Sequence, residues 1–110
     1  MMAGVRLVKL RFKSDQKQVW LDWCEQLKVR SNEVLETLKN EGALSEACFL
    51  SGDGETIYYF MEVEDFERAR VAFKNSTFKI DSEHREAILR SLERVEELTT
   101  LFHFQNRDSK

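Results

Sequence analysis

Residues 43–63 constrain the fold of this chain most, because two runs of aromatic and branched residues flank Asp53-Gly54. Asp and Gly tolerate the positive φ of tight turns, so the pair predicts a β-hairpin with a two-residue turn and Gly52 opposite Glu55. One predicted face carries Glu46 and Tyr59. The other face carries Phe49, Tyr58, Phe60 and Glu62. Both faces are rich in apolar residues, so both need to be covered.

Composition indicates one domain, residues 1–110, with 42% apolar and 34% charged residues and no linker rich in proline and glycine. The net charge of −3 comes without a basic stripe, which argues against a nucleic-acid partner or a membrane surface. No segment approaches the roughly 20 apolar residues that span a bilayer. The chain shows no signal peptide near Met1, and we expect a cytoplasmic location. Cys24 and Cys48 are expected to be buried, reduced core residues.

The order of expected elements is strand, long helix, hairpin, two helices and a last strand. It predicts an α+β fold of the ferredoxin-like, split βαβ type, with a four-stranded antiparallel sheet and helices on one face. The other face of the sheet would stay open, so we expect a homodimer that buries it. The expected ranges are a strand at 4–12, a helix capped by Ser14 or Asp15 and ending near Asn40, a helix at 66–76 capped by Asp65, a helix from Asp81 or Ser82 to about Glu97, and a strand at 98–104.

The first helix carries one apolar stripe with a single interruption. Its members recur at spacings of three and four, as a helix that packs on a core requires. They are Trp20, Trp23, Leu27, Val34 and Leu38. Arg30 and Ser31 stand where the pattern calls for an apolar residue. Arg30 is expected to lay its stem on the core and send its guanidinium to solvent or to a carboxylate.

Several motifs together resemble a family of small bacterial proteins of unknown function, which is similar to the dimeric α/β-barrel branch of the ferredoxin-like fold. The resemblance spans Arg6 to Phe104, and Lys79 stands where the family has proline. The motifs are Trp20 to Glu41, Glu46 with Phe49-Leu50, Tyr58 to Glu62 with Asp65, and Ile80-Asp81-Ser82-Glu83-His84-Arg85. The wider superfamily includes cofactor-free monooxygenases, haem-degrading enzymes and binding proteins. The resemblance therefore implies a fold and a dimer, and no particular reaction.

His84 is the candidate catalytic residue, because an imidazole at the start of a helix can carry protons near neutral pH. The alternative is that His84 only forms hydrogen bonds within the core. Asp81, Glu83 and His84 do not converge on one centre, so we expect no metal and no cofactor. An RNA-binding sheet is rejected, because Glu55 opens the third strand and the strand lacks the glycine of that motif.

A pocket between the helices and the sheet is expected, with Arg30, Glu46, Tyr59 and His84 at its rim. Its expected apolar walls are Trp20 and Trp23. The alternative is a buried ion pair between Arg30 and Glu46, and Glu62 is then expected at the dimer seam. Two functions follow from these residues. One is a protein that binds a small molecule, with a monooxygenase-like enzyme without cofactor as one form of it. The other is a structural or regulatory homodimer without activity.

Overall fold

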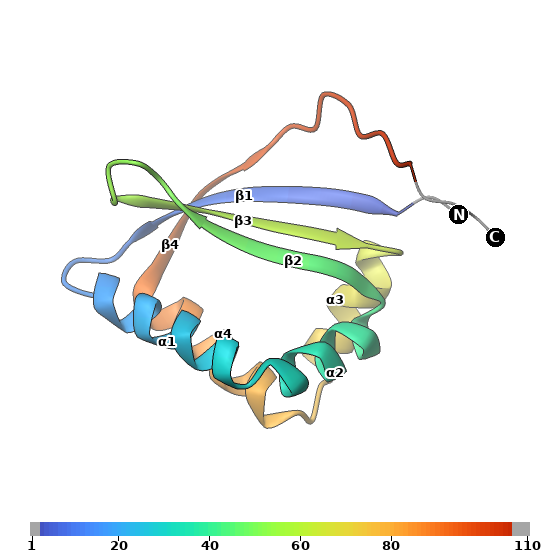
Figure 1. Cartoon of the computed structure of the whole chain (residues 1–110), viewed down its shortest axis with the longest axis horizontal. Coiled ribbons are helices and arrows are strands. Elements are labelled where there is room, and N and C mark those ends of the chain that lie inside the picture. The colour runs from blue at the N-terminus through green and yellow to red at the C-terminus, as the bar shows by residue number, and fades with distance from the viewer. Residues whose placement is uncertain (1–2, 107–110) are drawn as a thin grey trace.

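Four antiparallel strands form one sheet, and all helices lie on one of its sides (Figure 1). The computed structural model describes residues 3–106. The strand order is β2-β3-β1-β4, so β2 and β4 are the edges. The predicted α+β fold of ferredoxin-like type is confirmed. The elements are β1 (Gly4–Phe12), α1 (Lys17–Val29), α2 (Ser31–Glu41), β2 (Ala43–Leu50), β3 (Thr56–Val63), α3 (Phe66–Lys74), α4 (Lys79–Ser91) and β4 (Leu92–Leu98).

The hairpin of β2 and β3 has the predicted register but a longer turn. Leu50 lies opposite Ile57 and Ser45 opposite Glu62, as Gly52 opposite Glu55 requires. The expected two-residue turn is wrong, because the Ser51 amide donates to the Thr56 carbonyl at 2.8 Å and leaves four residues in the loop. The Asp53 carboxylate holds this loop by accepting from the Glu55 amide at 3.0 Å.

The expected long helix is two helices, with the break at Arg30. Its φ of −99° and ψ of 35° end α1, and α2 begins at Ser31. The interruption of the apolar stripe therefore marks the point where one helix ends and the next begins. The predicted caps Ser14 and Asp15 are wrong, because α1 begins at Lys17 without a side-chain cap. Gly42 ends α2 with a φ of 71°, a left-handed conformation that glycine adopts without strain.

The last helix and the last strand both lie earlier in the chain than expected. Helix α4 ends at Ser91, and β4 occupies Leu92–Leu98 instead of 98–104. Leu92, Val95 and Leu98 recur every three residues, which is typical of a helix. Val95 is an extra residue in the ladder, because Leu10 pairs with Arg94 and Lys9 with Glu96. This bulge interrupts the alternation by which a strand is recognised.

The core lies between the helices and the sheet. Its buried members are Leu10 of β1, Trp20 of α1, Ile57 of β3 and Leu92 of β4. Trp20 and Ile57 are each only 1% exposed.

Two expectations at the edges of the core are wrong. Cys48 is exposed on the edge strand β2, although Cys24 is half-buried. Asp81 does not cap α4, whose first helical residue is Lys79. Asp65 does cap α3, where it accepts from the Glu67 and Arg68 amides.

The C-terminal segment crosses to the side of the sheet away from the helices (Figure 1). The Gln105 side chain donates to Glu62 at 3.2 Å, and His103 Nε2 lies 4.0 Å from the same carboxylate. Glu62 is therefore 6% exposed, whereas Phe49 on the same face is 55% exposed. Among the described residues, no helix is both long enough and apolar enough to cross a bilayer.

Candidate functional site

Four side chains from α1, α4, β3 and β2 form a directional chain of hydrogen bonds. The Trp23 indole donates to His84 Nδ1 at 2.8 Å, and His84 Nε2 lies 2.8 Å from the Tyr59 hydroxyl. Tyr59 donates in turn to Glu46. An indole nitrogen only donates, so Nδ1 must offer its lone pair and the imidazole carries its hydrogen on Nε2. His84 therefore donates to Tyr59, and all bonds run from Trp23 towards Glu46.

Burial sets the protonation of this chain. It lowers the pKa of His84 to about 4, and the bond from Trp23 requires the same neutral imidazole. Burial, with the Glu46 charge beside it, raises the pKa of Tyr59 well above its ordinary value. Burial also raises the pKa of Glu46, against the opposing effect of the Tyr59 hydroxyl. At neutral pH, Tyr59 thus keeps its hydrogen for Glu46.

A second buried group joins α2 to α4. The Thr37 hydroxyl lies 2.6 Å from Asp81 Oδ2 and 3.2 Å from Glu41 Oε2. All three residues are at most 7% exposed. Burial, with Asp81 and Glu46 close by, raises the pKa of Glu41 to about 7. Glu41, Glu46 and Asp81 are called the carboxyl set below.

A cavity of about 510 Å³ lies between the helices and the sheet. A cavity of this size is typical of small-molecule sites. Its polar lining consists of the carboxyl set, Thr37, Tyr59, His84 and the three arginines Arg6, Arg70 and Arg94. Most of its lining is apolar and includes Val8, Leu10, Phe66, Phe73, Ile80 and Ile88.

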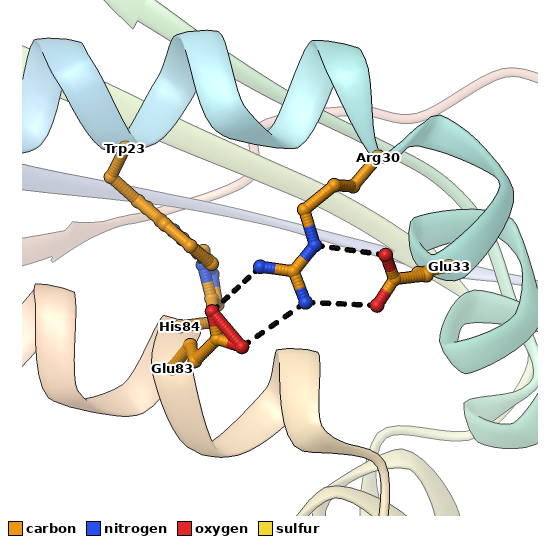
Figure 2. Close-up of polar contacts among 5 residues, drawn as sticks. All are labelled: Trp23, Arg30, Glu33, Glu83 and His84. Atoms are coloured by element: carbon orange, nitrogen blue, oxygen red, sulfur yellow. Dashed lines mark hydrogen bonds and ion pairs between the residues drawn. The ribbon is translucent and has the colours of Figure 1, made fainter.

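Arg30 lies outside this cavity and fastens α4 to the joint between α1 and α2 (Figure 2). Its Nε and Nη2 donate to both oxygens of Glu33 at 2.9 and 2.8 Å. Its Nη1 and Nη2 donate to both oxygens of Glu83 at 2.6 and 3.1 Å. The guanidinium lowers the pKa of both glutamates. These three residues are called the arginine clamp below.

The structure brings together three of the predicted pocket residues, Glu46, Tyr59 and His84. Arg30 does not reach Glu46, so the expected ion pair between them does not form. Trp20 and Trp23 do not line the cavity: Trp20 is in the core, and Trp23 is bonded to His84 Nδ1.

Sequence reasoning missed Thr37 and Glu41 and took Asp81 for a helix cap. A signal was present for Glu41, because it follows Leu38 by three residues and Val34 by seven. It is therefore a charged residue on the apolar stripe of its helix. Within residues 3–106, no group of three or more His, Cys, Asp or Glu side chains is arranged to hold a metal ion.

Fold and cavity together define a small α+β protein of ferredoxin-like type with a cavity between its helices and its sheet. The chain belongs to the family of unknown function DUF6176, which it matches over residues 3–109. The predicted membership of a family without known function is thus confirmed. No curated protein matches the chain.

Solved structures share this fold at low sequence identity. A conserved protein of unknown function from Bacteroides thetaiotaomicron, described as a possible oxidoreductase, has a TM-score of 0.57 at 15% identity and covers 88% of this chain and 96% of its own. Protein YJCS has a TM-score of 0.57 at 18% identity, and the match covers 94% of this chain and 100% of that protein. A conserved protein from Methanosarcina mazei has a TM-score of 0.53 at 21% identity, and the match covers 89% of this chain and 92% of that protein. These similarities show the fold alone.

Proposed function

We propose that this protein binds a small, largely apolar molecule in the cavity between its helices and its sheet. The observation that carries the proposal is the cavity of about 510 Å³, whose apolar lining ends at a cluster of polar groups. Tyr59 and His84 are held in place by hydrogen bonds and border this space. A preformed apolar cavity with a few fixed polar groups is the usual form of a small-molecule site.

Filling the cavity tests this proposal. Ala69 of α3 is 7% exposed and lines the cavity, so Ala69→Phe places a ring inside it. Isothermal titration calorimetry with octanol is expected to show binding to the wild type and none to this variant. Val71→Phe is the matched control, because Val71 lies on the same helix, is 41% exposed and is not part of the cavity lining. Equal octanol affinity of Ala69→Phe and the wild type would contradict the proposal.

Catalysis in the same cavity, as in a monooxygenase without cofactor, is the second candidate. It is supported by the hydrogen-bonded chain from His84 to Glu46 on the cavity wall, and by the description of one structural neighbour as a possible oxidoreductase. His84 would then act in proton transfer, as the sequence predicted. Oxygen uptake with a panel of phenols, abolished in His84→Gln, is the expected result. No uptake with any phenol would leave binding as the function.

We further propose that two copies associate through the sheet face opposite the helices, in the cytoplasm. Phe49, Tyr58 and Phe60 share this face, and Phe49 is 55% exposed. Both cysteines are free thiols, as a reducing compartment keeps them. Light scattering should give twice the chain mass of 13.0 kDa for the wild type and 13.0 kDa for Phe49→Asp. Leu35→Asp, at an exposed position of α2, is the control that should stay dimeric, and a monomeric wild type would contradict the proposal.

A further inference from the structure

The carboxyl set lines the cavity without an ion pair to any cation of residues 3–106. In the part of the chain that the structure describes, no Lys, Arg or His forms an ion pair with Glu41, Glu46 or Asp81. The arginines of the cavity wall are paired elsewhere. Arg6 and Arg94 bind Glu97, and Arg70 binds Glu67. Buried carboxylates are costly unless they are paired, so the absence of a cation has to be explained.

Glu41 is the member that shares its donor at the longer distance. It is 6% exposed, and its hydrogen-bond partner among residues 3–106 is the Thr37 hydroxyl. A hydroxyl has one hydrogen, and Asp81 is the nearer acceptor at 2.6 Å against 3.2 Å for Glu41. When Thr37 donates to Asp81, the ionised Glu41 has no donor among residues 3–106. This acceptor is more than nine-tenths buried and lies on the cavity wall.

The charges of the cavity are separated along the sheet. Glu46 is on β2 and Arg94 on β4, which are the opposite edges of the sheet and so are separated by three strand spacings of about 4.8 Å each. The lining between these edges is mainly apolar, except for Arg6 of β1, which lies in the row of Glu46 with Met61 of β3 between them and is paired with Glu97. A molecule that fills this space meets carbon side chains along its length and acidic groups at the β2 end.

On the basis of the proposed function, we infer that the molecule bound in this cavity carries a positively charged nitrogen, as a primary amine does, and that Glu41 and Asp81 hold it. An ammonium group has three N–H donors and no acceptor, so it satisfies several carboxylate oxygens at once. It also balances the charge that Thr37 leaves uncompensated. The apolar lining then selects amines with a hydrocarbon body.

Three probes of one chain length test this inference by titration calorimetry with the full-length protein. They are octylamine, octanol and octanoate, which differ only in the head group. Octylamine is expected to bind at least about tenfold more tightly than octanol, because hydrogen bonds to charged groups exceed neutral ones by that margin. Octanoate is expected to bind most weakly, because its carboxylate meets the carboxyl set.

Two variants locate the head group. Glu41→Gln should lose the preference for octylamine over octanol. Glu36→Gln removes an exposed acid from the same helix and should keep the preference. Asp81→Asn is the second variant at the site, for use if Glu41→Gln does not fold. It should also weaken the binding of octylamine.

The outcomes separate the two proposals. If octanol binds the wild type as tightly as octylamine, or if Glu41→Gln keeps the preference, the inference is wrong and the proposed binding function stands. If Zn²⁺ alone binds the wild type tightly and competes with octylamine, the carboxyl set is a metal site and the inference is also wrong. If none of the probes binds, the proposed function fails and this inference with it.

Discussion

The arginine clamp and the carboxyl set are both charged groups that link α2 or its start to α4, but they are built in opposite ways. In the clamp, one guanidinium donates to two carboxylates, and Glu33 keeps half of its side chain exposed. In the carboxyl set, three acids lie at a cavity, and the Thr37 hydroxyl is shared by two of them. In the clamp the acids are paired with a cation, whereas in the part of the chain that the structure describes the carboxyl set forms no ion pair. The difference distinguishes a structural ion pair from a candidate binding site.

The two groups also respond to pH in opposite directions. Arg30 lowers the pKa of Glu33 and Glu83, so their stabilisation is present above the ordinary value of 4.5 and is lost as the pH falls below it. Glu41 has its pKa raised to about 7 by burial. Its protonated form is favoured in the folded protein, so stability is lost as the pH rises from 4.5 to about 7.

The largest expected effect is that of Glu41→Gln, which removes the buried acid. Near pH 8 this variant should be more stable than the wild type by on the order of 3 kcal/mol, the free energy that corresponds to the raised pKa. The gain should be small near pH 4.5, where Glu41 is protonated in the folded chain and half protonated in the unfolded chain. Urea denaturation at both pH values measures it.

Neighbouring charges are the same in the wild type and this variant, so the difference isolates Glu41. The charged groups that face Glu41 are Asp81 of α4 and Glu46 of β2. The cation Arg68 of α3 is paired with Glu64 instead of Glu41. Glu36→Gln, at an exposed position of α2, should show no such dependence. A stability gain of Glu41→Gln that is equal at both pH values would contradict the account.

Thr37→Val should have the next largest effect, a loss of about 1 to 3 kcal/mol at neutral pH. The substitution keeps the shape of the side chain and removes the hydroxyl between Glu41 and Asp81, which are both more than nine-tenths buried. Urea denaturation measures the loss. Thr37→Ser keeps the hydroxyl and should lose less stability. Equal stability of the Val and Ser variants would show that the hydroxyl contributes little to the free energy of unfolding.

Trp23→Phe should act on His84 with a smaller effect. It removes the indole donor that requires a lone pair on Nδ1, so the imidazole becomes easier to protonate. The pKa of His84 should rise from about 4 by roughly one unit, which is the worth of one neutral hydrogen bond. The titration of the imidazole signals by NMR measures it. An unchanged midpoint would mean that burial alone keeps His84 neutral.

The smallest effect should come from the arginine clamp, despite its four hydrogen bonds. Glu83→Gln removes one carboxylate that is 31% exposed, and ion pairs at the surface contribute little because solvent and salt screen them. The loss of stability should be smaller than in Thr37→Val and should decrease further in molar salt. Thermal denaturation with and without salt measures it, and a loss larger than that of Thr37→Val would reverse the comparison.

The fold was predictable because its strongest signals are local. The Asp53-Gly54 pair set the register of β2 and β3, and Asp65 marked the start of α3. The end of the chain was not predictable in this way. The bulge at Val95 gives β4 a spacing that fits a helix, and only pairing with β1 shows that it is a strand.

The site was predictable only in part, for a different reason. Glu46, Tyr59 and His84 were identified as polar or aromatic residues in apolar surroundings, and all three line the cavity. Arg30 gave the same signal and forms the clamp, because the sequence does not show that Glu83 lies beside it. Asp81 gave the signal of a cap, and its contact with Thr37 depends on how α2 packs against α4.

The protonation of Glu41 tests the central claim most directly, because the account requires a carboxyl group that is uncompensated in the empty cavity and paired when an amine is bound. NMR titration of the labelled Glu41 carboxyl carbon measures it with and without octylamine. The account predicts a midpoint near 7 in the free protein and a fall of at least about one unit with octylamine bound. A midpoint near the ordinary 4.5 that octylamine does not move would contradict it.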